Sequence, residues 1–378
     1  MCSSLPEGRL FLERFIVIGV LGSFLSIIGV IFNGLLATLF LTRSNYRHSP
    51  FFFLGFVAFF DTLLDATFVL LLSVPVNAQF YDTYSVFLVW IEYLPALHLL
   101  MQIFKLSSVF CLVAASIERY IMTRHWTFTG FEQRTRWLAL TGAVTLAVFI
   151  KKYSSEELIV QELEGCSGFG RWMVGSKPIS SGHDLLGLVH TLAISVPFFT
   201  LILLNGGIVL MLKKQNVQQL RSLITELTLG HDVMKMRKKN IRQATQTLIV
   251  IITAYLISNL LTLCLILIEY IDRDILHQDH PDLHRLALDI ASLLTVIGNV
   301  IRFPAHFCSN SDIRQQFKQM LCGDKRDMKS LPNNRMRRMS EKCDNPWVTL
   351  LLRVNETTDV VAPEDPIPSR QPLLPTQL

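Results

Sequence analysis

Charged side chains are scarce in this sequence. Asp, Glu, Lys and Arg together make up only 17% of the 378 residues, whereas hydrophobic residues make up 51%. An ordinary soluble domain needs fewer apolar side chains than this to fill its core. The composition therefore argues against a soluble protein and predicts that lipid is the main solvent of the chain.

The usual sequence signatures of catalysis and transport are also missing. No nucleophile, metal-ligand cluster or phosphate-binding loop occurs at a usable spacing. The chain has no internal repeat and no pair of Gly- or Pro-broken hydrophobic segments in corresponding halves, which are features of transporters. We therefore expect neither an enzyme nor a transporter, and we expect no nucleic-acid partner.

Long hydrophobic segments are what the sequence has in abundance. A bilayer core of about 30 Å needs roughly 20 mostly apolar residues per helix. Six segments meet this criterion: 15–41, 51–76, 95–120, 185–212, 245–268 and 286–307. A seventh, 137–150, spans only about 21 Å as a helix, so it has to borrow from its polar flanks, tilt little or lie in thinned bilayer. The prediction is an all-α membrane protein with a seven-helix bundle.

Lys and Arg are unevenly distributed between the segments that join these spans. They are frequent after spans one, three and five, whereas the alternate loops contain Glu and Asp. Lys151 and Lys152, at the far end of the short fourth span, are the exception. The positive-inside rule then places the N-terminal segment, residues 1–14, outside and the C-terminus in the cytoplasm. This is the topology of a multi-pass protein of the plasma membrane.

The segment that follows the last span changes character twice. Residues 312–321 form a basic amphipathic run, which predicts a short eighth helix and extends the bundle to residues 15–321. Cys322 closes this run, and either an S-acyl chain or a reduced cytosolic thiol fits it equally. Residues 322–378 are Arg-rich and then Pro-rich without helical periodicity, so we expect a disordered tail.

The seven cysteines show no paired spacing. In the predicted topology only Cys2 and Cys166 face the oxidising side, so they are the candidates for a disulfide bridge. Cys111, Cys264 and Cys308 lie within helices, where we expect small apolar residues.

Polar residues inside the spans carry most of the information about function. An ionisable group in hydrocarbon costs several kcal/mol and normally faces the interior of a bundle. In span three the polar residues recur at helical spacing and so share one face. A water-filled cavity is one interpretation, and hydrogen bonding between helices is the other for Asn33, Ser108 and Asn299. The residues are Asn33, Asp61, Asp65, His98, Gln102, Lys105, Ser108, Asn259, Asn299 and Arg302.

Several short motifs, taken in their order and spacing, resemble rhodopsin-like G-protein-coupled receptors over residues 15–321. They are Asn33 in span one, LGFVAFFD ending at Asp61, ERY at 118–120, Pro197 in span five, and FPAHF, with Pro304, followed by CSNSDIRQQF. The segments WIEYLP (90–95) and AYLISN (254–259), together with Glu269, look most like invertebrate, especially nematode, FMRFamide-type neuropeptide receptors. The resemblance implies a heterotrimeric G protein, an extracellular ligand and membrane lipid as partners.

The resemblance also implies roles for particular residues. Arg119, beside Glu118 and Tyr120, matches an arginine that is held by its acidic neighbour at rest and turns to the G protein on activation. Asp61 and Ser108, with Asn299, match residues that surround a bound sodium ion.

Two departures argue against sodium in this chain. Phe303 and Phe307 replace polar residues of the last motif, and Arg302 adds a cation nearby. We therefore expect an Asp61–Arg302 contact in place of a sodium site, and no cofactor.

Ligand class follows partly by exclusion. Amine receptors have an Asp where this chain has Met101, and opsins have a retinal-binding Lys where it has Ile297. Acidic outer loops would attract a cationic ligand, which suits an amidated peptide ending in Arg-Phe. We expect Lys105 to pair with Asp65 rather than to hold an acid of the ligand. The candidate ligand contacts are Tyr93, His98, Gln102, Lys105, Asn259 and Glu269.

Two further departures leave alternatives open. Leu94 stands where the family has the span-three cysteine of a disulfide to the second outer loop, and Leu260 and Leu261 stand where span six has its kink-forming proline. A chemosensory receptor for a small molecule and a non-signalling decoy therefore stand beside the neuropeptide receptor.

Overall fold

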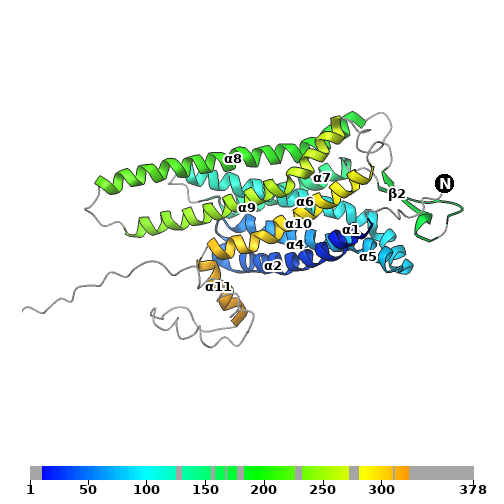
Figure 1. Ribbon diagram of the computed structural model, residues 1–378. Helices are drawn as coiled ribbons and strands as arrows, with labels where there is room; N and C mark the ends of the chain where they lie inside the picture. The colour runs from blue at the N-terminus through cyan, green and yellow to red at the C-terminus, as the bar shows by residue number, and fades with distance from the viewer. Residues whose placement is uncertain are drawn as a thin grey trace, which may run out of the picture. The chain divides into compact units, whose positions relative to one another are not determined.

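The computed structural model describes residues 11–124, 130–154, 158–166, 168–176, 183–225, 232–271, 281–309 and 311–322. The chain divides into two compact units, Met1–Ser311 and Asp312–Leu378. Long helices of the first unit run side by side as a bundle (Figure 1). Most of the predicted tail, and residues 1–10 of the predicted N-terminal segment, lie outside the described residues.

Seven helical rods build the described part of the bundle. The first two are composite, because helical segments follow one another without a break, and the short α3 (Ser44–Arg47) connects them. The segments are α1 (Phe11–Arg14), η1 (Phe15–Gly22) and α2 (Ser23–Thr42), then α4 (Phe52–Phe68), η2 (Val69–Ser73) and α5 (Val74–Phe80), and then α6 (Tyr84–Arg124), α7 (Gln133–Ser154), α8 (His183–Thr225), α9 (Asp232–Ile271) and α10 (Pro281–Ser309).

Six of these rods contain a described helix long and apolar enough to cross a membrane: Phe11–Thr42, Phe52–Phe80, Tyr84–Arg124, Leu188–Lys214, Thr245–Ile271 and Leu283–Ser309. They coincide with the six long segments predicted from hydropathy. The helices continue beyond the apolar residues, and the first one begins at Phe11, inside the predicted N-terminal segment.

Helix α7 is the rod that corresponds to the short fourth span. It has 22 residues, Gln133–Ser154, which gives a length of about 33 Å. The extension beyond 137–150 comes from polar flanks with Arg134 and Arg136 at one end and Lys151 and Lys152 at the other. The helix therefore gains its length from polar flanks, one of the three solutions expected for this span.

The segments η1 and η2 are π-helical, and neighbouring side chains donate hydrogen bonds to their carbonyl groups. A π-turn is wider than an α-turn, so its backbone is exposed to partners from outside the helix. The four bonds join the first rod to the second, and the second to α6. The donors and acceptors are Ser73 Oγ to Ile18 O (3.0 Å), Asn77 Nδ2 to Gly19 O (3.4 Å), Trp90 Nε1 to Leu71 O (3.2 Å) and Tyr93 OH to Leu70 O (3.1 Å).

A short antiparallel hairpin, which the sequence patterns did not predict, packs on α6. Its strands β1 (Leu158–Glu162) and β2 (Trp172–Ser176) pair from Leu158 with Ser176 to Glu162 with Trp172, and the 3-10 turn η3 (Gly168–Arg171) lies between them.

Aromatic rings fix the hairpin to α6. The Phe169 ring centroid lies 5.4 Å from that of Tyr84 and 5.0 Å from that of Phe87, and Trp172 Nε1 donates to the Tyr84 hydroxyl (3.1 Å). Leu94, in the same cluster, stands where the resembling receptors have a disulfide cysteine. Aromatic packing thus connects two elements that a disulfide connects in those receptors.

The second unit contains one described helix, α11 (Ser311–Cys322). It covers the predicted amphipathic run 312–321. Its apolar residues Ile313 and Phe317 are four positions apart, so they lie on one face, and both are buried. The side chain of Cys322 lies outside the described atoms.

We predict that Tyr93→Phe lowers the melting temperature of the detergent-solubilised protein. The substitution removes the hydroxyl that donates to Leu70 O and costs about 1 kcal/mol. Tyr81→Phe is the matched control, because Tyr81 is exposed and keeps its ring packing against Phe15 and Phe80 when the hydroxyl is lost. Equal melting of both variants and the wild type would contradict the role of this bond.

Candidate polar core and Arg119 site

An ion pair between Asp61 on α4 and Arg302 on α10 lies inside the bundle. Arg302 Nη1 contacts Asp61 Oδ2, and Ser108 Oγ of α6 donates to Asp61 Oδ1 (2.8 Å). All three side chains are buried, with Asp61 fully inaccessible. The contact that the sequence predicted between Asp61 and Arg302 is therefore present, and it joins three helices.

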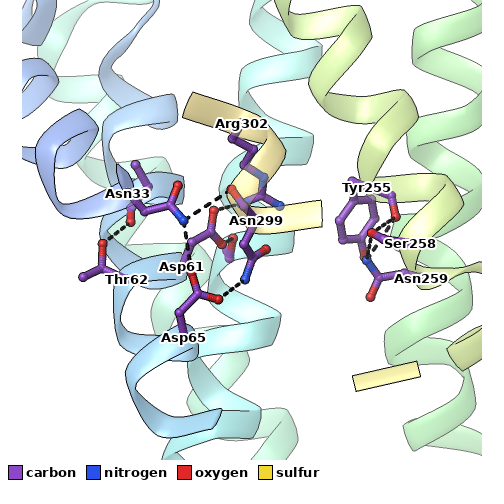
Figure 2. A network of polar contacts seen from close by, with 11 residues as sticks. Asn33, Asp61, Thr62, Asp65, Tyr255, Ser258, Asn259, Asn299 and Arg302 are labelled. Atoms are coloured by element: carbon purple, nitrogen blue, oxygen red, sulfur yellow. Dashed lines mark hydrogen bonds and ion pairs between the residues drawn. The ribbon is translucent and has the colours of Figure 1, made fainter. Parts of the chain in front are cut away.

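A second carboxylate, Asp65, lies one helical turn further along α4 (Figure 2). Asn33 Nδ2 donates to its Oδ2 (3.1 Å), and Asn299 Nδ2 donates to its Oδ1 (2.9 Å). Asn33 Nδ2 also reaches the backbone oxygen of Asn299 (3.3 Å). Gly29 is required here, because a Cβ at this position would lie 2.2 Å from the Asp65 carboxylate. Two amides and a close helix approach thus hold Asp65.

These contacts do not fit a sodium site. Sodium would need oxygen ligands from Asp61, Ser108 and Asn299 around one centre. The amide of Asn299 donates to Asp65 instead, and the guanidinium of Arg302 occupies the carboxylate of Asp61. Pro304 lies within α10 two residues after Arg302, and the Phe303 ring that precedes it stacks on Phe32 (4.5 Å).

At the far end of α6, Glu118 pairs with Arg136 of α7. Arg136 Nη2 lies 2.7 Å from Glu118 Oε1, which also accepts from the backbone N–H of Phe131 (2.8 Å). Gly130 has a φ of 113°, a backbone conformation that favours glycine, and a Cβ there would lie 3.0 Å from Glu118 Oε1. The expectation that Glu118 holds Arg119 is therefore wrong for this structure, because Arg136 has taken its place.

Arg119 is buried, and none of the described carboxylates forms an ion pair with it. Its side chain is 3% exposed, and its guanidinium carbon lies 5.4 Å from the centre of the Phe51 ring. In the described part of the chain, its Nε and Nη2 atoms have no hydrogen-bond acceptor. The Phe51 ring also packs against the rings of Phe40 and His306. An arginine held by a cation–π contact keeps donors available for an acceptor that arrives from outside.

Tyr120 packs against α8 beside Arg119. A Cβ on Gly207 would lie 2.9 Å from the Tyr120 ring, so this glycine makes the close approach possible. The three residues of the ERY motif thus face three different neighbours: α7, Phe51 at the start of α4, and α8.

The predicted ligand contacts separate into two groups. Tyr93 and Asn259 are engaged within the protein, because the Tyr93 hydroxyl donates to Leu70 O and Asn259 Nδ2 donates to Tyr255 O (3.0 Å) and Ser258 Oγ (3.2 Å). Figure 2 shows the Asn259 group apart from the Asp61 group. The other four, which are half-buried, are His98, Gln102 and Lys105 on α6 and Glu269 on α9.

The predicted pair of Lys105 with Asp65 is wrong. Both oxygens of Asp65 accept from amides, and among the described residues no carboxylate forms an ion pair with Lys105.

The sequence patterns missed the parts played by Arg136, Phe51 and Lys151. Arg136 was counted only as a positive charge near the membrane surface, and Phe51 only as an apolar residue. Lys151 was noticed as an exception to the charge distribution, and the structure buries it to 4% exposure. For Lys151, its departure from the charge distribution was the sequence signal that could have indicated burial.

Cys166, between β1 and η3, is disulfide-bonded, whereas the described cysteines Cys111, Cys264 and Cys308 are free. The predicted partner, Cys2, lies outside the described residues.

We predict that Arg302→Met lowers stability by about 3–5 kcal/mol, because it leaves the buried Asp61 without its cation. The double variant Asp61→Asn with Arg302→Met should recover most of this loss. Melting curves of the single and double variants measure the coupling. Additive losses would contradict a direct interaction between the two side chains.

We also predict that Arg302→Ala gains a stabilisation by sodium that the wild type lacks. The substitution frees the oxygens of Asp61 and Ser108 for a hard cation. The measurement is the melting temperature in NaCl and in choline chloride at equal ionic strength. A sodium effect of the same size in both proteins would rule out Arg302 as the group that occupies this position.

Neither a protein-family model nor a curated protein matches the sequence. Solved structures do match the fold. The crystal structure of squid rhodopsin aligns with a TM-score of 0.60 over 86% of this chain and 93% of that chain, at 16% sequence identity. A similarity at this level of identity concerns the fold, and it agrees with the predicted fold class. This chain is an all-helical, multi-pass membrane protein with a rhodopsin-like fold.

Proposed function

We propose that this chain is a G-protein-coupled receptor and that Arg119 is its switch towards the G protein. The observation that carries the proposal is the burial of Arg119 with two of its donor nitrogens lacking an acceptor in the described part of the chain. A buried, unsatisfied guanidinium is costly, so a conformation that offers it an acceptor is favoured.

A G protein can supply that acceptor. The C-terminal end of a helix presents free backbone carbonyls with a partial negative charge, which suits a guanidinium. In this proposal the Arg119 end of α6 faces the cytoplasm, in agreement with the positive-inside rule, and the hairpin end faces outside. Glu118 leaves Arg119 free at rest because Arg136 occupies it.

The ligand class follows from the resemblance. An amidated neuropeptide is the first candidate, and a small molecule detected by a chemosensory receptor is the second. His98 and Gln102 on α6 support a ligand site towards the hairpin end, because they are half-buried and share one helix face with Lys105.

We predict that Arg119→Ala abolishes the G-protein activation that a library of amidated peptides elicits in cells expressing the receptor. The loss follows because alanine cannot donate to the G protein. Arg124→Ala is the matched control, since Arg124 lies on the same helix and is exposed. Surface labelling and wild-type ligand affinity establish that both variants are folded.

Two results would contradict the proposal. An Arg119→Ala receptor that activates G proteins as the wild type does would exclude the switch role. A wild-type protein that binds ligand at the cell surface but activates no G protein would favour a decoy. Helix α9 continues through Leu260 and Leu261 and has no proline in its described length, which is the feature that favours this second function.

A further inference from the structure

Lys151 points into the bundle rather than towards lipid or water. It lies near the end of α7 and is 4% exposed, whereas its neighbour Lys152 is exposed. Among the residues of α7 whose side chains are described, the buried ones are Arg136, Leu140, Ala147 and Lys151. Their spacings of four, seven and four residues place them on one helix face. Arg136 shows where this face points, because it pairs with Glu118 of α6.

Lys105 lies at the same depth on α6. The Glu118–Arg136 pair fixes the register of these antiparallel helices. Lys105 is 13 residues from Glu118, and Lys151 is 15 residues from Arg136, in the same direction along the bundle. At 1.5 Å per residue these separations are about 20 and 22 Å. The charge of Lys105 acts on Lys151, which agrees with this placement.

No carboxylate among the described residues neutralises the two lysines. Helix α7 and the membrane segment Leu188–Lys214 of α8, which both pack with α6, contain no Asp or Glu. On α4, Asp61 pairs with Arg302 and Asp65 accepts from two amides. On α6 itself, Glu118 pairs with Arg136, and Glu92 is exposed and lies 13 residues from Lys105, about 20 Å.

Two like charges inside a membrane bundle, without a counter-ion, destabilise the protein that contains them. Such an arrangement persists where a ligand supplies the opposite charge, because binding sites keep groups that the unliganded fold does not need. We propose that Lys105 and Lys151 together bind an anionic group of the ligand, a carboxylate or a phosphate.

This inference rests on the proposed receptor function, because it specifies a chemical group of that receptor's ligand. The anionic group belongs to an acidic residue of a peptide, to a small organic acid or to a lipid headgroup. Each presents two or more oxygens to two ammonium groups, which are point charges with three donors each. Gln102, three residues before Lys105 on the same face, lies beside this position.

The test measures the melting temperature of the full chain in detergent with sodium succinate, sodium phosphate or sodium chloride at equal ionic strength. We expect succinate or phosphate to raise the melting temperature of the wild type above its value in chloride. Lys105→Met and Lys151→Met should each weaken the apparent affinity at least about tenfold. Lys152→Met is the matched control and should respond as the wild type does.

The lysine variants give a second readout in chloride alone. Both should melt at a higher temperature than the wild type, because each removes an uncompensated charge. Variants that melt at a lower temperature would overturn the proposal, since the lysines would then have a partner within the protein. Lys105→Gln and Lys151→Gln serve the same purpose if the methionine variants do not express.

The remaining outcomes are also decisive. An equal response of all variants to succinate and phosphate, or no response of the wild type, would overturn the proposal. In nanodiscs, stabilisation by phosphatidylglycerol over phosphatidylcholine that is lost in both lysine variants would identify a lipid headgroup as the source of the anion. None of these measurements involves a G protein, so a failure of the Arg119 prediction leaves the anion site intact, and the reverse also holds.

Discussion

The structure depends on the cost of placing charge in hydrocarbon. Neither lipid nor a helix backbone can solvate a carboxylate, so each one needs a partner from another helix. Among the described residues, three carboxylates of the membrane helices meet a cation, and each pair joins two rods of the bundle. The pairs are Asp61 with Arg302, Glu118 with Arg136, and Asp289 with Arg14 (2.7 Å). These contacts set the register of the first, second, third, fourth and seventh rods.

Polar residues without charge complete the same framework at lower cost. Asp65 is held by the amides of Asn33 and Asn299, which bring α2, α4 and α10 together. Gly29 and Gly298 allow the helices to approach, because a Cβ on Gly298 would lie 2.5 Å from Ser258 Oγ on α9. Close packing of small residues and hydrogen bonds replace the hydrophobic effect as the force between membrane helices.

The sequence predicted the fold better than the partners of its charged residues. Hydropathy located the six long spans because a continuous apolar segment is a local property. Partner choice is not local. The Asp61–Arg302 ion pair was predicted correctly, because Arg302 is an extra cation within a recognised motif. The predicted pairs of Lys105 with Asp65 and of Glu118 with its neighbour Arg119 were wrong. Those errors arose because amides and Arg136, far apart in the sequence, satisfied both carboxylates first.

The pairing leaves a surplus of cations at two positions along α6. Arg119 lies over an aromatic ring at one end, and Lys105 lies with Lys151 about 20 Å away. Glu118–Arg136 stands between them as the contact that aligns α6 with α7. A ligand anion bound to both lysines would draw α6 and α7 together at that level. In this proposal a shift along α6 would reach the Glu118–Arg136 pair and, next to it, the Arg119 donors that lack an acceptor among the described residues, so the interface of α6 and α7 is the route by which the two sites would be coupled.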